Sequence, residues 1–505
     1  MKPPTWISRK VSRRATTPPP VTPHEQSEDV KTAAGGSADG RSTTASVPLP
    51  APAAAKADKE RSLPERLAAT LSRKGEALSP RALRRTLDAL RAIVDPDIGD
   101  VEGGRLAEAV IGTYAGMTAA ERRDVWLLMS EIFVADAKQV KQAQARFAAA
   151  VGTPDEAAAE VLYRRATVSP RRRLLQRFSA FAGGIRFLVD LRAEMLPHLK
   201  GERRLRALDV EMEYMFSTWF DTGFLDLQRI SWDSPASLVE KLIRYEAVHD
   251  VRGWDDMKNR LDSDRRCYAF FHPRLPGEPL IFVEVALMDH LTSEVGPLLD
   301  VAADHVDLSR VNTAIFYSIS NTQAGLKGVS FGDSLIKRVV EALQQEFPRL
   351  RTFSTLSPIP GLRPWLVRNV AQLLERTPAR EQLQLARALQ ADDLQAPKLL
   401  ATLELAHELP AESPVRRWLA RAAGHYLTAE MNEGKPVDAV ARFHLGNGAR
   451  VERINWAADL SARGLAQSCG MMVNYLYDLN RLDRHRTMLA SGRVPASRAM
   501  ASQHF

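Results

Sequence analysis

The spacing of apolar residues changes after about residue 215. Through residues 61–215 apolar positions recur three or four residues apart, which is the spacing of one face of an α-helix. Leu83, Leu87, Leu90 and Ile93 show it clearly, because charged residues fill most of the positions between them. This region is therefore predicted to be a bundle or layer of consecutive helices, and it shows no strong strand pattern.

Short motifs indicate where helices begin in this region. A serine or threonine followed three residues later by glutamate can satisfy the first free N–H groups of a helix. A capping serine directly before proline has a similar effect, because proline suits the first helical position. The motifs are Ser62-x-x-Glu65, Thr118-x-x-Glu121, Ser79-Pro80 and Ser169-Pro170.

Beyond residue 215 the pattern becomes mixed. Cys267–Phe271, Leu280–Leu287 and Thr313–Ile319 are short β-branched or aromatic runs bounded by Pro, Gly and Asp, which predicts strands. Helical spacing predicts helices over Phe331–Phe347 and Ala379–Leu409, the second broken before Pro397. The fold class is therefore α+β multidomain: an all-α N-terminal helical domain followed by a mixed α/β domain.

Composition separates a further segment at the start of the chain. Residues 1–60 are rich in Pro, Ala, Ser, Thr and Gly and have almost no large apolar residues after Ile7, so we predict a disordered tail. Met1–Thr17 is basic and without acids, which is also a weak feature of organelle transit peptides. A sustained amphipathic stripe is missing, and a basic disordered tail is the favoured interpretation.

Charge and cysteine content exclude several classes of protein. The net charge of +8 allows an anionic partner, but the arginines are scattered among nearly as many acids, so no nucleic-acid partner is predicted. The net positive charge is also compatible with a polyanionic cofactor such as coenzyme A. Two cysteines and widely spaced histidines give no disulfide framework and no metal motif. No apolar run is long enough for a membrane span.

A glycine-rich stretch, Gln323–Gly332, follows a predicted strand and opens a predicted helix. Glycines at such a junction let backbone N–H groups approach a phosphate, and the helix N-terminus favours negative charge. The stretch lacks the Lys-Ser/Thr ending of a P-loop and the spacing of the dinucleotide fingerprint. From the residues alone, a simple turn and a phosphate-binding loop are both open.

Two side chains have settings that suit chemistry. Ser357 lies on a proline-stiffened loop without the Gly-x-Ser-x-Gly elbow of a hydrolase, so a turn serine and a reactive hydroxyl are both open. His444 precedes Asn447-Gly448, which predicts a hairpin between strands Ala439–Leu445 and Ala449–Trp456. Histidine suits proton transfer because its usual pKa is close to the working pH.

A collinear series of motifs resembles the malonyl-CoA decarboxylase family over roughly half the chain. The most recognisable are the Ser-Thr-Leu-Ser-Pro-Ile-Pro-Gly loop that holds Ser357 and the Phe-His-Leu-Gly-Asn-Gly-Ala segment that holds His444. The motifs are Arg265–Tyr268, Pro276–Leu280, Ala314–Gly328, Ser354–Gly361, Phe443–Ala449, Arg453–Asp459 and Ser468–Tyr477.

This resemblance implies a catalytic domain with an acetyltransferase-like (GNAT) fold over residues 216–505, with a helical insertion near 370–430. It implies that Ser357 and His444 are catalytic and that the glycine-rich stretch is similar to the pyrophosphate loop of that fold. It also allows residues of the other matched motifs to orient the histidine or line the acyl pocket, although on the residues alone Asn455 could equally be a turn or capping residue and Tyr477 a core aromatic. The residues expected to bind substrate or coenzyme A are Gln323, Gly325, Gly328, Gly332, Asn455 and Tyr477.

The activity implied is conversion of malonyl-CoA to acetyl-CoA and CO₂. The thioester itself takes up the electrons, so no separate cofactor and no metal are expected. The family also implies a homo-oligomer, usually a tetramer, with residues 61–215 as the oligomerisation domain. A cytoplasmic location is the default, because the chain ends in Ser502–Phe505 rather than the Ser-Lys-Leu of some animal members.

Two other functions remain open on the residues. The same fold supports an acyl-CoA-dependent N-acyltransferase, although Ser357 and His444 are less well explained there. A non-enzymatic helical assembly protein fits residues 61–215 but leaves the later motifs without a role. Formation of acetyl-CoA from malonyl-CoA alone, without an acceptor, distinguishes decarboxylation from both.

Overall fold

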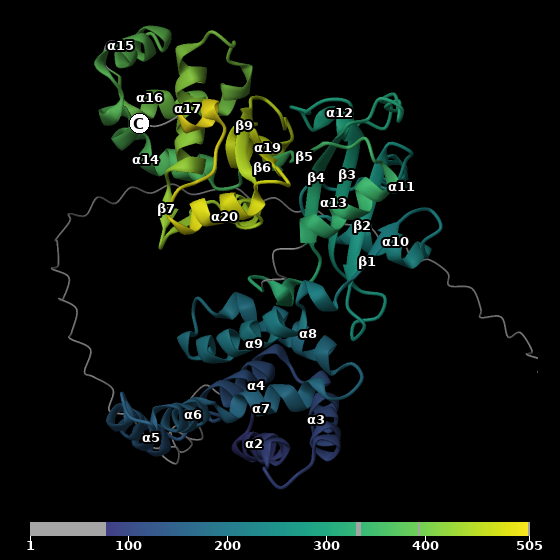
Figure 1. The fold of residues 1–505 in the computed structure, drawn as a ribbon, viewed down its shortest axis with the longest axis vertical. Helices are drawn as coiled ribbons and strands as arrows, with labels where there is room; N and C mark the ends of the chain where they lie inside the picture. The colour runs from purple at the N-terminus through teal and green to yellow at the C-terminus, as the bar shows by residue number, and fades with distance from the viewer. Residues whose placement is uncertain (1–76, 330–334, 392–393, 503–505) are drawn as a thin grey trace, which may run out of the picture. The chain divides into compact units, whose positions relative to one another are not determined.

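The computed structural model describes residues 77–329, 335–391 and 394–502 (Figure 1). The predicted tail over residues 1–60, the helix start at Ser62 and the loop residue Gly332 lie outside the described residues. No helix among the described residues is both long enough and apolar enough to cross a bilayer.

The first part of the described chain is helical, as predicted. Thr118 and Glu121 form a complete capping box at the start of α4, and the Ser79 hydroxyl accepts from the Ala82 N–H at the start of α2. Ser169 precedes α7, but its hydroxyl contacts Glu211 instead of capping the helix. The elements are α2 (Pro80–Val94), α3 (Asp100–Ala115), α4 (Ala119–Glu131), α5 (Ala137–Ala150), α6 (Glu156–Thr167), α7 (Pro170–Ser179), α8 (Gly184–Met195), η1 (Leu196–His198), η2 (Arg203–Leu205), α9 (Arg206–Trp219) and η3 (Thr222–Phe224).

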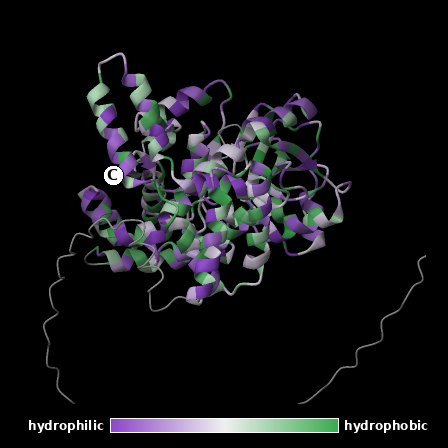
Figure 2. Cartoon of the chain, turned by 90° about the horizontal axis from the view of Figure 1, so that it is seen from below, coloured by the Kyte–Doolittle hydropathy of each residue, from purple (hydrophilic) through white to green (hydrophobic). Residues whose placement is uncertain are grey.

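These helices are amphipathic. Leu83, Leu87, Leu90 and Ile93 of α2 are all buried, which confirms the predicted apolar face. Hydrophobic and hydrophilic residues alternate along the helices in the hydropathy-coloured view (Figure 2). The apolar faces therefore supply the packing that marginal helix propensity alone would not.

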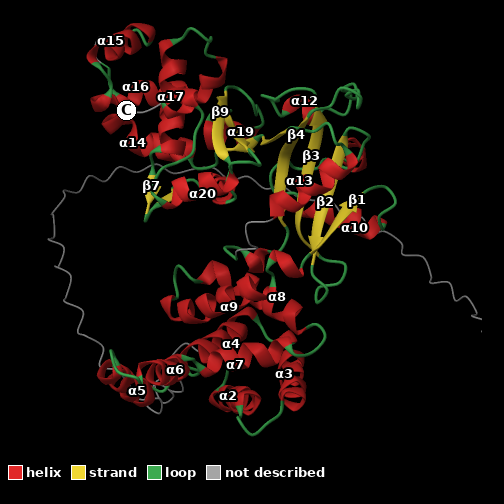
Figure 3. Cartoon of the chain, in the orientation of Figure 1, coloured by secondary structure: helices red, strands yellow, loops and turns green. Residues whose placement is uncertain are grey.

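A mixed sheet follows the helices (Figure 3). Among the described residues it has eight strands in the order β1-β2-β3-β4-β5-β10-β6, with β9 paired to β10. The strands predicted over Cys267–Phe271, Leu280–Leu287 and Thr313–Ile319 are confirmed as β2, β3 and β4. The elements of this stretch are β1 (Asp226–Ile230), α10 (Ala236–Tyr245), α11 (Trp254–Arg260), β2 (Arg265–Phe271), β3 (Pro279–Met288), α12 (Gly296–Leu299), β4 (Thr313–Asn321), η4 (Ala324–Leu326), α13 (Leu335–Glu346), β5 (Thr352–Thr355) and β6 (Ser357–Pro358).

Strands β4 and β5 form a parallel pair within an otherwise antiparallel sheet. A parallel pair needs a crossover connection, which here carries α13. The pairing runs from Thr313 opposite Thr352 to Phe316 opposite Thr355 and then stops, although β4 continues to Asn321. Beyond this point the chain leaves β4 but remains paired with β10, which already lies beside Ser354 of β5, and Ser357 lies opposite Val473.

The rest of the chain adds helices and the final strands. The predicted break before Pro397 is confirmed, because α15 ends at Ala388 and α16 begins at Ala396. The elements are α14 (Leu362–Arg376), α15 (Ala379–Ala388), α16 (Ala396–Ala401), η5 (Thr402–Glu408), α17 (Pro414–Thr428), β7 (Met431–Asn432), β8 (Lys435–Pro436), α18 (Ala439–Gly446), β9 (Arg450–Asn455), α19 (Ala462–Ser468), β10 (Met472–Leu476), α20 (Leu482–Ala490) and α21 (Arg498–Ala501).

The predicted hairpin around His444 is wrong in its first strand. Residues 439–446 form helix α18, and only the segment after Asn447-Gly448 is a strand, β9. Asp438 explains the helix, because its carboxylate accepts from the N–H groups of Val440 and Ala441, both at 2.9 Å. Gly448, with φ +86°, then turns the chain from helix to strand.

Candidate active site

Ser357 lies where the chain parts from β4 while it stays paired with β10. It is the first residue of β6, directly after the parallel pairing with β4 ends, and its side chain is buried. In open α/β sheets ligands bind beyond the carboxyl ends of parallel strands, at the point where strand order changes. The following Pro358 and Pro360 restrict the backbone, so the hydroxyl is held in a fixed direction.

The structure brings the two predicted catalytic side chains together. The Oγ of Ser357 lies 3.2 Å from Nε2 of His444, although the two residues are 87 positions apart. On the other side of the ring, Nδ1 of His444 lies 2.8 Å from the hydroxyl of Tyr477. A third contact joins Ser357 to Thr355, whose Oγ1 accepts from the serine hydroxyl at 2.8 Å.

Burial fixes the protonation of this chain of groups. Loss of water lowers the pKa of His444 to about 3, so its imidazole is neutral at pH 7. Burial also raises the pKa of Tyr477, so its hydroxyl stays protonated. Because the Ser357 hydroxyl donates to Thr355, Nε2 of the neutral ring is the donor in its contact with Ser357. Nδ1 is then the unprotonated ring nitrogen and accepts from the Tyr477 hydroxyl.

Thr355 and Asn474 hold the serine strand in place. The Thr355 Oγ1 also accepts from the backbone N–H of Tyr475 at 3.2 Å, and the Thr355 carbonyl accepts from the Asn474 side chain at 2.7 Å. The Asn455 side chain donates to the side-chain amide oxygen of Asn474 at 2.8 Å. Asn455 therefore acts on Ser357 through Asn474 and the strand, with no hydrogen bond to Ser357 or His444 among those that the structure describes.

The histidine is held by its helix and by an aromatic ring. The side chain of Tyr475 stacks on His444, with ring centroids 4.7 Å apart and an interplanar angle of 25°. Asp438 caps the start of α18 and also accepts from the Tyr426 hydroxyl at 3.3 Å and from the backbone of Gly361. Gly361 ends the loop that carries Ser357, and α18 carries His444. Asp438 therefore connects the two segments that hold the catalytic pair.

The sequence did not single out Asp438, Thr355, Asn474 or Tyr475. Asp438 had a usable signal, because an aspartate directly before an apolar run is a common helix start. Thr355 lies two residues before Ser357, and this spacing places both side chains on one face of an extended segment.

The glycine-rich stretch lies at the end of β4, away from the serine in sequence. The side-chain amide of Gln323 donates to the Pro279 carbonyl at 3.0 Å, and its Oε1 accepts from Arg186 at 2.7 Å. Gly325 is buried in the turn η4, and Gly328 has φ +83°. Gln323 thus uses both ends of its amide to hold the loop, and the two glycines supply its tight path.

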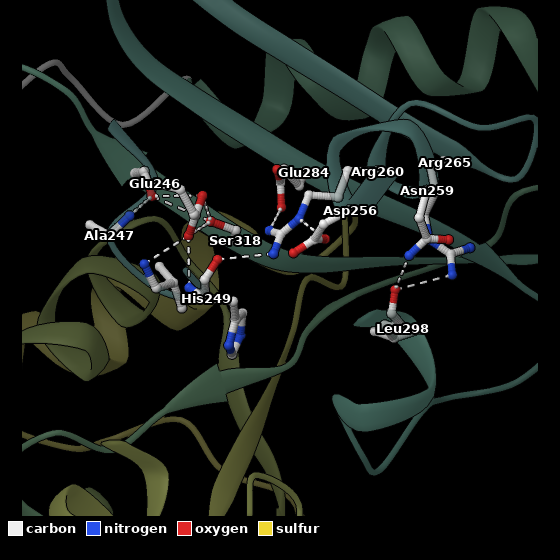
Figure 4. A network of polar contacts seen from close by, with 12 residues as sticks. Glu246, Ala247, His249, Asp256, Asn259, Arg260, Arg265, Glu284, Leu298 and Ser318 are labelled. Atoms are coloured by element: carbon white, nitrogen blue, oxygen red, sulfur yellow. Dashed lines mark hydrogen bonds and ion pairs between the residues drawn. The ribbon is translucent and has the colours of Figure 1, made fainter. Parts of the chain in front are cut away.

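A buried polar network lies between β4 and the connection from α10 to α11 (Figure 4). The Glu246 carboxylate accepts from the hydroxyls of Ser318 at 2.8 Å and Ser320 at 3.3 Å, and from the N–H groups of Val248 and His249. It therefore fastens this connection to the strand that leads into the glycine-rich stretch.

A buried ion pair continues this network. Arg260 is fully buried, bonds Asp256 at 2.9 Å and Glu284 at 2.8 Å, and donates to the carbonyl of His249 at 3.0 Å. Burial raises the pKa of Glu284, and the nearby guanidinium opposes this rise. These groups satisfy one another, which gives them a structural role. Within residues 77–502, the described part contains no cluster of His, Cys, Asp and Glu side chains suited to a metal ion.

The site thus defines a class of protein: a catalyst with a neutral Ser–His–Tyr hydrogen-bonded chain on a mixed sheet, preceded by a helical region. Two family models match it in order. Residues 133–220 match the malonyl-CoA decarboxylase N-terminal domain, and residues 223–504 match the malonyl-CoA decarboxylase C-terminal domain.

Relatives agree with the family models. Mitochondrial malonyl-CoA decarboxylase from Anser anser anser is 36% identical over 432 residues, which cover 82% of this chain and 85% of that protein. The enzyme of the same name from Rattus norvegicus is 36% identical, covering 78% of this chain and 84% of that protein.

Solved structures agree as well. The malonyl-CoA decarboxylase from Cupriavidus metallidurans is 42% identical with a TM-score of 0.69, covering 84% of this chain and all of that one. The enzyme from Rhodopseudomonas palustris is 37% identical with a TM-score of 0.71, covering 83% of this chain and 98% of that one. The chain belongs to the malonyl-CoA decarboxylase family.

Proposed function

We propose that this protein decarboxylates malonyl-CoA to acetyl-CoA and CO₂. The observation that carries the proposal is the 3.2 Å contact between Ser357 and a neutral, buried His444. When the carbon–carbon bond to the carboxylate breaks, its electron pair moves into the thioester and leaves an enolate. The protein must then orient the leaving carboxylate, stabilise the developing oxyanion and supply one proton to carbon.

The hydrogen-bonded chain suits delivery of that proton. The Ser357 hydroxyl transfers its proton to the enolate carbon, and Nε2–H of His444 stabilises the oxygen left behind by a hydrogen bond. Tyr477 keeps its own proton and holds Nδ1 in place. Solvent returns one proton to Ser357 after each turnover, which balances the reaction. Before the reaction, the Ser357 hydroxyl donates a hydrogen bond to Thr355 Oγ1.

We infer that the sheet region is GNAT-like and takes coenzyme A where β4 and β5 part. The support is the parallel β4–β5 pair, its crossover through α13 and the end of pairing beyond Phe316 and Thr355. The loop from Gln323 to Gly328, which follows β4, is proposed to hold the pyrophosphate, since its glycines permit close backbone approach. Gly332 belongs to the same proposal.

The proposed reaction is tested with the purified protein and malonyl-CoA alone. Decarboxylation gives acetyl-CoA and CO₂ without an added acceptor, which liquid chromatography of the acyl-CoA products measures. An N-acyltransferase would instead require an amine acceptor and give a malonylated product. Absence of acetyl-CoA at saturating malonyl-CoA would contradict the proposal.

We also propose a homo-oligomer, a tetramer by family resemblance, located in the cytoplasm. Apolar side chains exposed on the helical region support an assembly surface there, among them Val101, Val161, Leu162 and Val168. Light scattering of the purified protein tests the assembly, and a monomer at working concentration would contradict it. Cell fractionation tests the location.

A further inference from the structure

The helical region contacts the glycine-rich loop directly. Helix α8 packs closely against η4. The Arg192 side chain of α8 also donates hydrogen bonds to the carbonyls of Gly325 and Lys327. Because this loop is the proposed pyrophosphate site, the helices before the sheet have a role beyond assembly. We propose that α8 positions the phosphate-binding loop and that Arg192 is the positioning residue. This inference rests on the proposed coenzyme A site.

Arg192 is almost fully buried and bridges three elements. Its Nε bonds the Asp209 carboxylate of α9 at 2.9 Å. One terminal nitrogen donates to the carbonyls of Gly325 at 2.7 Å and Lys327 at 2.9 Å. A planar guanidinium reaches all of these groups at once, whereas a lysine ammonium lacks the fork geometry.

These bonds set the direction of the loop backbone. A trans peptide unit directs its C=O and its N–H to opposite sides. Since the Lys327 carbonyl points to Arg192, the N–H of Gly328 points to the other side of the loop. That is the orientation a phosphate needs, because anion-binding loops present N–H groups to their ligand.

The effect of Arg192 is geometric rather than Coulombic. Its charge is balanced by the Asp209 carboxylate at 2.9 Å and by the Glu213 carboxylate, which lies 3.6 Å from its other terminal nitrogen. Little net positive charge therefore remains for a distant anion. The arginine acts on the ligand through the loop it orders.

Two further contacts fix the same loop on α8. Gly325 lies so close to the helix that a methyl group on it would be 1.9 Å from the carbonyl oxygen of Val189. Arg186, one turn before Val189, donates to the Gln323 side chain at 2.7 Å. The loop is therefore held by α8 at Gln323, Gly325 and Lys327, while β3 holds Gln323 from the other side through Pro279.

Arg192→Lys is the first test, with Arg171→Lys as its matched control. Arg171 is also buried and donates to three carbonyls, of Met129, Ser130 and Ala207, all within the helical region. Gly325→Ala disturbs the contact without changing any charge. Its control is Gly112→Ala, because an added methyl group at Gly112 meets nothing within 4 Å.

Each variant is assayed with malonyl-CoA and with a malonyl thioester of N-acetylcysteamine, which lacks the nucleotide and its phosphates. We expect Arg192→Lys and Gly325→Ala to lower kcat/KM for malonyl-CoA about tenfold through KM, the effect of roughly one lost bond to a charged donor. The truncated substrate should react as with wild type. Both controls should keep the wild-type ratio of the two substrates.

Two outcomes overturn the proposal. Equal losses on both substrates mean that Arg192 only stabilises the chain. Wild-type kcat/KM on both substrates means that the loop does not depend on α8. Calorimetry with free coenzyme A keeps the inference separate from the proposed reaction. If wild type binds coenzyme A but forms no acetyl-CoA, the reaction fails while the loop is still tested by the affinity of each variant.

Discussion

At the scale of single residues, the neutral state of His444 decides how the site handles protons. A charged imidazole would need a carboxylate partner, but the partners of the ring are two hydroxyls and a stacked tyrosine. If Ser357 and His444 act as one unit, either alanine variant removes most of the effect. We therefore expect Ser357→Ala and His444→Ala each to lower kcat by about 10² to 10⁴.

The double variant should be little slower than the slower single variant, because groups that act together lose their effect together. Steady-state kinetics with malonyl-CoA measures all three. Ser354→Ala is the control, since Ser354 is an equally buried serine whose hydroxyl bonds the Tyr475 carbonyl. Full activity of Ser357→Ala would sink the mechanism, and simply multiplicative losses would assign the two residues separate roles.

The pKa of His444 also predicts a pH dependence of stability. The folded pKa is about 3 and the ordinary value is 6.5, so the unfolded chain binds this proton first as pH falls. The free energy of unfolding should therefore decrease with falling pH below about 6.5. A single such proton contributes up to about 1.4 kcal/mol per pH unit.

Urea unfolding of wild type and His444→Asn between pH 4 and 6.5 measures this contribution. The variant should show a shallower pH slope, because it lacks the group that protonates on unfolding. Other buried histidines, such as His249 and His272, remain in both proteins and cancel in the comparison. Identical slopes would mean that His444 is already protonated in the folded chain.

The sequence predicted both residues of this pair but not their contact. A hydrogen bond between positions 357 and 444 depends on the sheet order β5-β10-β6 and on helix α18, neither of which local spacing encodes. The family motifs identified the two residues, but only the fold shows that Ser357 Oγ and His444 Nε2 lie 3.2 Å apart.

At the scale of elements, α18 and the serine loop share one anchor in Asp438. Its carboxylate caps α18 and accepts from Tyr426 and the Gly361 backbone. Asp438→Ala should destabilise the fold by about 1–2 kcal/mol as a lost cap. It should also lower kcat about tenfold, because both mounts of the pair become less fixed.

Chemical denaturation and kinetics measure the two effects together. Asp438→Asn still offers a capping oxygen and should recover most of both. Asp136→Ala is the control, because Asp136 caps α5 through the Gln139 N–H and touches neither mount. If Asp438→Ala were destabilised to the same degree as this control but fully active, the anchor would be structural only.

The helix α18 also shows where pattern reading fails. Ala439–Leu445 was predicted as a strand because Asn-Gly is a strong hairpin signal. The same dipeptide equally ends a helix, since Gly448 adopts the left-handed conformation that a C-terminal turn requires. The capping side chain of Asp438 decides between the two, and it lies one residue before the apolar run Ala439–Leu445. The long strands β2–β4, in contrast, were predictable because their apolar runs are nearly fully buried.

At the scale of the whole molecule, residues 1–60 should be dispensable for catalysis. Their composition lacks core-forming side chains, and the family motifs all lie beyond them. A protein beginning at residue 61 should keep the wild-type kcat and melt within about 2 °C of it. Calorimetry and kinetics measure this, and a large loss of either would contradict the predicted tail.

The order of a helical region followed by a sheet region could be predicted from the sequence, but the contact of α8 with the loop after β4 could not. The change of spacing near residue 215 separated the helices from the sheet. Nothing in local spacing showed that Arg192 and Gly325, 133 residues apart, would meet. Buried arginines with distant carbonyl partners leave no periodic pattern.

The close approach of Gly325 to Val189 limits how this enzyme can be recombined. A sheet region joined to a foreign set of helices would meet a different backbone at position 189, and only a helix on the same path leaves room for the loop. A chimera with a single crossover between residues 195 and 323 would take α8 and the loop from different parents, so we expect crossovers outside this range to be tolerated better. Helix α8 and the loop are therefore expected to be inherited together, although more than 120 residues of sequence separate them.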